Sequence, residues 1–323
     1  MIRNLVRSWR GRVAILCYHR VLKKDVIDRD ICPLKNMAVS EANFNKQMKF
    51  LKKNYNVISM DQLIDHLNSQ SKEFVVAITF DDGYKDNFTC ALPILEFYEL
   101  PSTFFITTRF PEKDCGMYWY ELWELIERKK NISITNDNQI YFYNLVGDQN
   151  KIDAFNSISN IIEKEKPDIQ KEIMLKIRGN IKAKDYSHIC LNWDELKKIS
   201  ESPKLTIGSH GHSHLSFGIL NIDEKKTELH LSKKLIEKNL GIKVNHFAYP
   251  FGQIKDFNQN DKNLFYDLEY SSACLAFPNK IKYNSFNRYQ LPRIAIRDEP
   301  INIFNAKING LDNFFSILKN KSL

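Results

Sequence analysis

FVVAITFDDG, residues 74–83, joins an apolar run to two adjacent carboxylates. The β-branched and aromatic residues of this run predict a buried strand, and Gly83 permits a tight turn after it. Asp81 and Asp82 repel each other, and burying either one is unfavourable unless a cation lies close by. Their position at the end of a strand therefore indicates a metal site, although Asp-Asp-Gly is also ordinary in a solvated turn.

A second apolar strand ends in a cluster of histidines. The run Leu-Thr-Ile-Gly at 205–208 precedes His210, His212 and His214, so three of the chain's eight histidines fall within five residues. Histidine is the commonest metal ligand, and two histidines with one carboxylate leave coordination positions for water and substrate. A hydrogen-bonding surface loop would explain a single histidine, but the cluster together with the paired aspartates favours a metal site.

This set of ligand types is compatible with two kinds of chemistry. Two histidines and a carboxylate suit zinc, and the same set occurs in iron(II) oxygenases. A further carboxylate beside the ligands favours hydrolysis, because it can accept the proton of a water that attacks an amide. An oxygenase has no need of such a base. The residues therefore predict a hydrolase with a divalent ion, most simply Zn²⁺.

Three motifs, in this order, resemble those of the polysaccharide deacetylases, the carbohydrate esterases related to chitooligosaccharide deacetylase. They are Thr-Phe-Asp-Asp-Gly at 79–83, Ser-His-x-x-x-His-Leu at 209–215 and Phe-Ala-Tyr-Pro-Phe-Gly at 247–252. Tyr-His-x-Val at 18–21 is similar to the start of a subgroup in which the motifs are circularly permuted. The resemblance covers roughly residues 13–110 and 190–300, in pieces.

The resemblance implies a role for each matching position. Asp81 would be the general base that takes a proton from the attacking water, and the backbone N–H of Phe251 would help to bind the oxyanion. His212 falls at a variable position of the family and is left out of the site. The implied metal ligands are Asp82, His210 and His214.

The chain departs from the family pattern at two places. The C-terminal Leu-x-His that supplies the catalytic acid has no counterpart, since no histidine follows His246. In the permuted subgroup the acid comes from the N-terminal Tyr-His, which here implies His19. The arginine that usually precedes the oxyanion loop is also missing, because Asn245 and His246 stand there. We predict that Arg293 holds the general base in place instead.

Length and composition allow one large core, with 323 residues and 43% hydrophobic content. Strand-like runs alternate with helical patterns, and functional residues follow the strands, which favours a parallel α/β barrel. The resemblance implies a distorted (β/α) barrel of about seven parallel strands in a single catalytic domain, residues 1–323. Strands are expected at 13–18, 74–80, 103–107, 204–209, 246–249, 269–274 and 290–296, and helices at 41–54, 60–69, 87–98, 192–201, 223–240 and 301–318.

Residues 111–190 interrupt the spacing between the first two motifs, and we expect them to form an inserted cap. This stretch contains a predicted hairpin at 131–143 and two charged helices. Tyr118, Trp119 and Tyr120 could stack on sugar rings. Packing of the insertion on the barrel is the alternative explanation for these aromatic residues.

The charge balance favours anionic partners. The chain has 47 basic and 39 acidic residues, a net charge of +8, which suits an acidic glycan, a lipid-linked diphosphate sugar or a membrane surface. The basic residues are dispersed and no nucleic-acid recognition motif is present, so nucleic acid is not expected as a partner. Residues 1–11 show apolar residues at helical spacing with three arginines on other faces, which predicts peripheral membrane contact. Packing of this helix on the barrel floor is the alternative.

No apolar stretch is long enough to span a membrane, and no secretory h-region follows the early arginines. The six cysteines show no paired spacing, which indicates reduced thiols in a cytoplasmic protein, peripheral to the inner membrane face if residues 1–11 bind lipid. The predicted function is metal-dependent removal of an N-acyl group, most simply acetyl, from an amino sugar of a polysaccharide or of a lipid- or nucleotide-linked precursor. A hydrolase of small amides or esters and a catalytically silent glycan-binding homologue are the alternatives.

Overall fold

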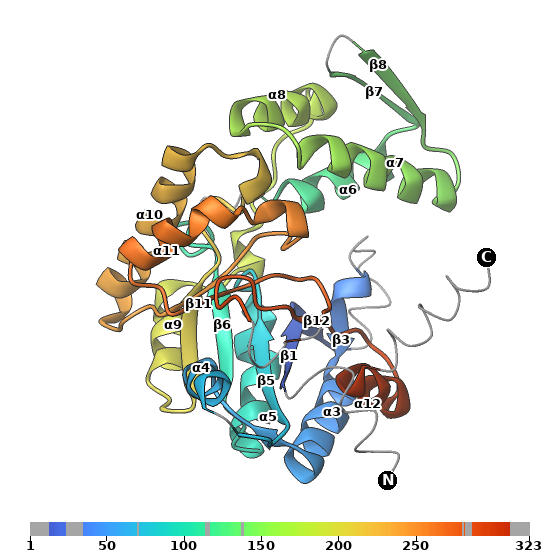
Figure 1. The fold of residues 1–323 in the computed structure, drawn as a ribbon. Coiled ribbons are helices and arrows are strands. Elements are labelled where there is room, and N and C mark those ends of the chain that lie inside the picture. Colours follow the sequence, from blue (N-terminus) through green and yellow to red (C-terminus); the bar gives the residue numbers. More distant parts are fainter. Residues whose placement is uncertain are drawn as a thin grey trace, which may run out of the picture.

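A parallel sheet that curls into a distorted (β/α) barrel forms the main body of the structure, a computed structural model (Figure 1). The strand order is β11-β10-β9-β6-β5-β1-β12, and β4 pairs with β5 outside this path. This arrangement confirms the predicted parallel barrel. The strands are β1 (Val13–Tyr18), β4 (Asn56–Val57), β5 (Val75–Phe80), β6 (Ser102–Ile106), β9 (Leu205–Ser209), β10 (His246–Ala248), β11 (Ser272–Cys274) and β12 (Ile294–Ala295).

The structure describes only part of the chain. The described residues are 13–23, 35–69, 71–113, 117–136, 139–279, 281 and 286–310. The predicted membrane-contacting segment, residues 1–11, lies outside them. The assignment of the whole chain to one domain stays a prediction.

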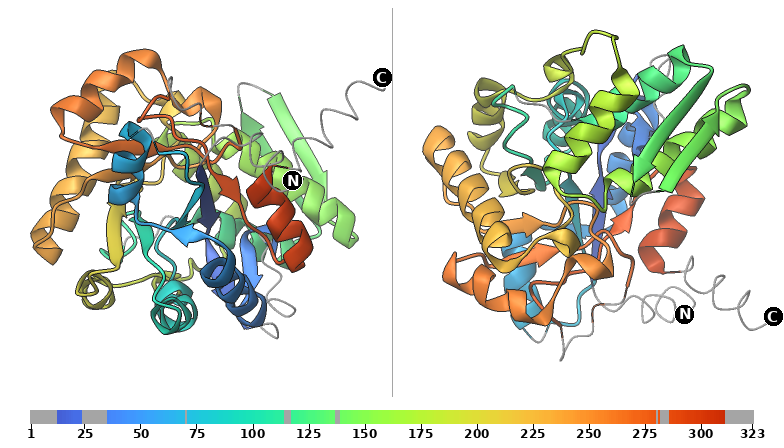
Figure 2. Two further views of the ribbon diagram at one scale, coloured as in Figure 1. Left: turned by 60° about the horizontal axis from the view of Figure 1, so that its bottom comes forward. Right: turned by 90° about the horizontal axis from the view of Figure 1, so that it is seen from above.

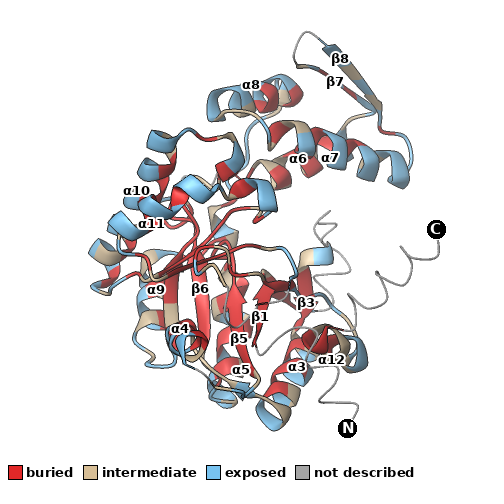
Figure 3. Ribbon diagram, in the orientation of Figure 1, coloured by how far each residue is buried: buried red, intermediate tan, exposed pale blue. Residues whose placement is uncertain are grey.

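The two faces of each central strand pack into different hydrophobic clusters. In β5, Val76, Ile78 and Phe80 belong to the large outer cluster, which contains residues of the surrounding helices. Val75 and Ala77 belong to a smaller cluster inside the barrel. Successive side chains of a strand point to opposite faces of the sheet. Both faces of these strands are buried (Figure 3), which is why residues on the outer and on the inner face are mostly apolar.

Helices cover the outside of the sheet and one end of the barrel. Residues of α4 join the inner cluster together with the first residues of β1 and β5, so α4 closes the end of the barrel where these strands begin. The other helices supply the outer cluster. Their bounds are α3 (Glu41–Asn54), α4 (Met60–Asn68), α5 (Leu92–Phe97), α9 (Trp193–Ser200), α10 (Ile222–Leu240), α11 (Lys262–Asp267) and α12 (Ile301–Asn309).

The secondary structure differs from the sequence prediction in a few segments. The strand expected at 290–296 is reduced to β12, because the chain there passes from one edge of the sheet to the other. Leu291 exchanges backbone hydrogen bonds with Ala273 and Leu275 beside β11, whereas Ile294 pairs with Leu16 of β1. Helix α11 was not predicted, and a π-helical turn, Asn87–Ala91, precedes α5. The second half of the helix predicted at 301–318 lies outside the described residues.

The insertion folds around a hydrophobic cluster of its own. Its elements are α6 (Tyr118–Arg128), β7 (Asn131–Asn136), β8 (Gln139–Asn144), α7 (Asp148–Ile162) and α8 (Pro167–Arg178). Strands β7 and β8 pair antiparallel, which confirms the predicted hairpin. Helices α6, α7 and α8 pack their apolar sides on one another and on this hairpin. The right view of Figure 2, taken from above, shows the insertion in front of the barrel.

Two expectations about the whole chain can be compared with the described residues. None of their helices has both the length and the apolar character needed to span a bilayer. Four of the six cysteines are described, and all four are free thiols: Cys17, Cys90, Cys190 and Cys274. The remaining two, Cys32 and Cys115, lie outside the described residues.

Candidate active site

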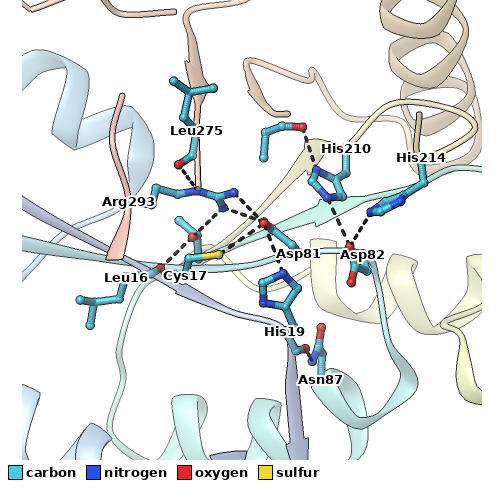
Figure 4. A network of polar contacts seen from close by, with 12 residues as sticks. Leu16, Cys17, His19, Asp81, Asp82, Asn87, His210, His214, Leu275 and Arg293 are labelled. Atoms are coloured by element: carbon cyan, nitrogen blue, oxygen red, sulfur yellow. Dashed lines mark hydrogen bonds and ion pairs between the residues drawn. The ribbon is translucent and has the colours of Figure 1, made fainter. Parts of the chain in front are cut away.

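The predicted site residues follow the carboxyl ends of parallel strands. His19 follows β1, Asp81 follows β5 and His210 follows β9. The carboxyl ends of neighbouring parallel strands meet at one edge of the sheet, so residues far apart in sequence come together there. Figure 4 shows them converging from separate strands.

Asp82 and two histidines form a group that could hold a metal ion. The Asp82 Oδ1 atom lies 3.2 Å from His210 Nε2 and 3.2 Å from His214 Nε2. The possible ligand atoms of these three residues all lie within 4.8 Å of one another. All three side chains are largely removed from solvent, His214 being the most exposed at 11%.

The hydrogen bonding of His210 shows why a cation belongs in this group. Its Nδ1 atom lies 2.8 Å from the carbonyl oxygen of Ala248. A carbonyl oxygen only accepts, so Nδ1 carries a proton and donates it. In the neutral ring, Nε2 then presents a lone pair to the Asp82 carboxylate, and two lone pairs face each other. A proton or a metal ion has to lie between them, and the carbonyl contact is typical of metal-binding histidines.

The electrostatics of Asp82 agree with a cation at this position. Burial raises the pKa of its carboxyl, but hydrogen bonds from His210 and His214 outweigh burial and hold the pKa well below its ordinary value. The carboxylate is therefore charged at neutral pH. The donor set, one carboxylate and two imidazole nitrogens, fits zinc and related divalent ions.

The backbone is strained at the same residues. Asp82, His214 and Phe251 have positive φ angles of 74°, 56° and 60°, and they are three of the six non-glycine residues with positive φ in the described part of the chain. This left-handed conformation is unfavourable for residues with a Cβ atom. Strain of this kind is retained mainly where a side chain must point in one direction, as in a binding site.

Asp81 does not share this group, because Arg293 holds it. The guanidinium Nη1 and Nη2 atoms donate to the two carboxylate oxygens at 2.6 Å each. Arg293 also donates to the Thr79 hydroxyl at 3.2 Å and to the Leu275 carbonyl at 3.1 Å (Figure 4). Burial raises the pKa of Asp81, but the charge of Arg293 and the neighbouring histidines outweigh burial and lower it. Asp81 is thus a charged carboxylate fixed beside the metal-type group, which consists of Asp82, His210 and His214.

The alternation of strand residues places Asp81 inside the barrel. Val75, Ala77, Thr79 and Asp81 are spaced by two, so they share the inner face. The same rule applied to β1 puts His19 inside. Its Nε2 atom lies 4.0 Å from Asp81 Oδ2, and its side chain is 16% exposed. Burial lowers the pKa of His19 despite the nearby carboxylates.

The loop after β10 presents a backbone donor. Among the described residues, none accepts a hydrogen bond from the N–H of Phe251. The next residue, Gly252, has a φ of +58°, and a Cβ atom there would lie 2.3 Å from the backbone nitrogen of Ala276. Only glycine fits, so this close contact fixes the loop. The Phe251 ring packs 5.0 Å from the ring of His214.

Six of the seven predicted residues line one pocket of about 320 Å³. They are His19, Asp81, Asp82, His210, His214 and Phe251. Arg293 is completely buried behind Asp81. His212, which was left out of the site, lies outside the metal-type group, and its Nδ1 atom is 2.9 Å from the Thr108 hydroxyl.

Several residues near the site were not found from the sequence. Cys17 Sγ lies 3.4 Å from Asp81 Oδ2, and its position two residues before His19 on a strand could have indicated this. Glu228 of α10 accepts hydrogen bonds from the backbone N–H groups of His212 and Ser213, at 2.8 Å each. No local sequence signal distinguishes Glu228 from the other charged residues of that helix.

The insertion supplies one wall of the pocket. Tyr118, Trp119, Phe155, Ser159 and Glu163 line it. The ring of Trp119 lies 5.1 Å from that of His214. Of the three aromatic residues singled out from the sequence, Tyr118 and Trp119 therefore face the pocket.

Tyr120 instead joins the insertion to the barrel. Its hydroxyl accepts a hydrogen bond of 2.6 Å from Arg20 of β2 (Arg20–Leu22), a short strand that pairs with β3 (Ala38–Ser40). Arg20 also donates to Asp86 at 2.9 Å. The alternative explanation, packing on the barrel, thus describes Tyr120.

Several solved structures, among them two deacetylases, share this fold. The Streptococcus pyogenes deacetylase PplD in complex with acetate is 17% identical, with a TM-score of 0.58 over 91% of this chain and 96% of that chain. IcaB from Ammonifex degensii is 16% identical, with a TM-score of 0.58 over 93% and 98%. A de-N-acetylase from Aggregatibacter actinomycetemcomitans is 19% identical, with a TM-score of 0.56 over 91% and 98%. At these identities the likeness concerns the fold.

The family is shown by the sequence itself. No curated protein sequence matches the chain. The model of the polysaccharide deacetylase family, in contrast, matches residues 68–137 and 155–268, more than half of the chain. These ranges contain the Asp81-Asp82 pair, both histidines of the metal-type group and the loop of Phe251. The permuted subgroup stays a prediction, but the chain belongs to the polysaccharide deacetylase family.

Proposed function

We propose that this chain is a metal-dependent hydrolase that removes the N-acetyl group from an amino sugar of a polysaccharide or glycan precursor. The observation that carries the proposal is the convergence of Asp82, His210 and His214 beside a separate carboxylate, Asp81, which has its own guanidinium partner. The family membership and the deacetylases among the solved structures support the same reaction class.

Asp82, His210 and His214 would hold the metal ion, with zinc as the first candidate. A divalent ion supplies positive charge that lowers the pKa of water and polarises an acyl carbonyl. The positive charge of Arg293 balances the negative charge of Asp81, and its two N–H groups occupy both carboxylate oxygens, which keeps this carboxylate from becoming a fourth ligand. Glu228 fixes the loop between the two histidines through its backbone contacts.

Asp81 and His19 would carry the protons. Asp81 is charged and faces the pocket, so it can accept a proton from the attacking water. His19 lies 4.0 Å from Asp81 and would protonate the amine that leaves, since an amide nitrogen is a poor leaving group without a proton. Arg293 acts on the reaction only through Asp81 and is a positioning residue.

Phe251 would stabilise the developing oxyanion through its backbone. Its N–H has no acceptor among the described residues and lies in a loop that the Gly252–Ala276 contact fixes. A donor held in place before the reaction needs no reorganisation during it, and one such donor contributes about 2.7–4 kcal/mol in other hydrolases.

The test combines acetate release with metal analysis. Purified protein should release acetate from N-acetylglucosamine oligomers, and the release should stop on chelation and return with a divalent ion. Asp81→Asn should retain stoichiometric metal and lose most turnover, whereas His210→Ala should lose the metal. His212→Ala, in the same loop but outside the group, is the matched control and should keep the metal.

Three results would argue against this assignment. Wild-type turnover in His19→Ala would exclude His19 as the acid. Loss of metal in Asp81→Asn would mean that the two aspartates exchange roles. Release of formate, or turnover of small amides but not of sugar oligomers, would move the substrate class away from N-acetyl sugars. A lipid- or nucleotide-linked substrate, membrane contact and the cytoplasmic location stay predictions.

A further inference from the structure

One side of helix α7 faces the pocket that contains the candidate catalytic residues. Phe155, Ser159 and Glu163 are spaced by four, so they lie on one side of the helix, and all three line the pocket. The backbone N–H of Glu163 bonds the carbonyl of Ser159 at 2.9 Å, so the helical conformation continues to this residue. The insertion therefore places Phe155, Ser159 and Glu163 in a row along this wall of the pocket.

Two polar groups on this wall are covered by other protein atoms. The Ser159 hydroxyl and the indole N–H of Trp119 are buried and have no hydrogen-bond partner among the described residues. The side chains are only 9% and 7% exposed. Both atoms are covered by protein and are not open to the pocket, so Glu163, rather than Ser159 or Trp119, offers a ligand an accessible polar group on this wall.

The carboxylate of Glu163 also lacks a partner. No ion pair or side-chain hydrogen bond joins it to another described residue, although it is half-buried. Burial raises its pKa, and the charge of Asp256 acts in the same direction, while Lys255 and Lys164 lower it. Burial raises the pKa of Tyr118 well above its ordinary value, and the charge of Glu163 adds to this rise. A carboxylate in these surroundings is best satisfied by a cation.

We propose that Glu163 binds the ammonium group of an already deacetylated amino sugar next to the sugar whose amide is cleaved. The inference rests on the proposed function, which generates such amines. Phe155 and Tyr118 line the same pocket and can cover the apolar face of a pyranose ring. The insertion thus selects partly deacetylated glycan over the fully acetylated polymer.

The selectivity can be measured with two oligomers of equal length. One is fully N-acetylated chito-oligosaccharide, and the other carries a single glucosamine unit. A charge-assisted hydrogen bond in a partly buried site corresponds to about a tenfold effect, so wild-type kcat/KM should be about tenfold higher for the glucosamine-containing oligomer. The ratio should fall as ionic strength rises.

The isosteric variant Glu163→Gln tests the charge. It should bring the kcat/KM ratio of the two oligomers close to one. Glu172→Gln is the matched control, because Glu172 lies in the same insertion, is 61% exposed and pairs with Lys176 rather than facing the pocket. It should leave the ratio unchanged. A wild-type ratio of one or below, or a ratio that Glu163→Gln leaves unchanged, would overturn the inference.

Failure of the proposed function would look different. In that case wild-type protein would release no acetate from either oligomer. Calorimetric binding of the same two oligomers to wild type and Glu163→Gln then tests the inference alone. Tighter binding of the glucosamine-containing oligomer, lost in the variant, would support it, and equal binding of the two oligomers to wild type would refute it.

Discussion

Replacing Arg293 with methionine tests the pair that holds the candidate general base. The guanidinium is completely buried and Asp81 is 2% exposed. Arg293→Met would remove both charged contacts to Asp81 and leave the Leu275 carbonyl without its donor. Removing one partner of a buried ion pair costs about 3–5 kcal/mol of the free energy of unfolding, because the remaining charge stays buried. We expect a loss of this size at pH 7.

The double variant Asp81→Asn/Arg293→Met separates the pair from simple packing. Removing both charges avoids an uncompensated buried ion, so the double variant should be destabilised by about 1–3 kcal/mol, chiefly from the unsatisfied carbonyl. The decrease in the free energy of unfolding of the double variant should therefore be smaller than the sum of the decreases in the two single variants, by about 2 kcal/mol or more.

The pH dependence of the loss has a defined sign. Burial without the guanidinium raises the pKa of Asp81 above its unfolded value, so the variant is penalised most above that raised pKa. As the pH falls towards the ordinary aspartate pKa of about 4, Asp81 is protonated in the folded variant and the penalty should shrink. Urea unfolding of chelated protein at several pH values measures this. A loss below about 1 kcal/mol at pH 7, or additive single losses, would refute the reasoning.

Three further changes have defined outcomes. Glu228→Gln weakens the acceptor for the backbone of the histidine loop and should lower metal affinity about 10–100-fold in a chelator competition; unchanged affinity would show that this loop needs no support. Gly252→Ala places a Cβ atom 2.3 Å from the Ala276 nitrogen and should lower stability by more than about 1 kcal/mol, seen as a lower Tm. Tyr120→Phe removes the hydroxyl that Arg20 contacts at 2.6 Å; amide exchange should become faster in α6, whereas uniform exchange throughout the chain would contradict this.

Much of the barrel could be predicted because its signals are local. The run from Val75 to Phe80 is apolar at every position but Thr79, as expected for a strand buried on both faces, and β5 has these bounds. Asn221 and Glu224 form a capping box at the start of α10, and this helix begins at Ile222, one residue before the predicted start. The strand predicted at 290–296 is longer than the observed strand β12. The chain here passes from one edge of the sheet to the other and so closes the barrel, which its apolar composition does not reveal.

Some residues of the candidate site could likewise be predicted from local sequence, and others could not. His210 and His214 lie on one loop, and Asp82 follows a strand whose carboxyl end is recognisable, so their meeting could be predicted from parallel topology. Glu228 and Glu163 could not be found in this way. Each is one charged residue among several on a solvated helix, and only packing shows which of them points inwards.

The sequence by itself therefore determined the barrel, the family and the side chains that gather at the strand ends, because strand periodicity and motif spacing are encoded over a few residues. Arg293 was proposed from the sequence as the partner of Asp81, but only the tertiary structure shows that its guanidinium occupies both carboxylate oxygens, and that the insertion places Ser159 and Glu163 at the pocket. Those contacts join segments separated by tens to hundreds of residues. Their geometry depends on how helices and strands pack, which no local pattern specifies.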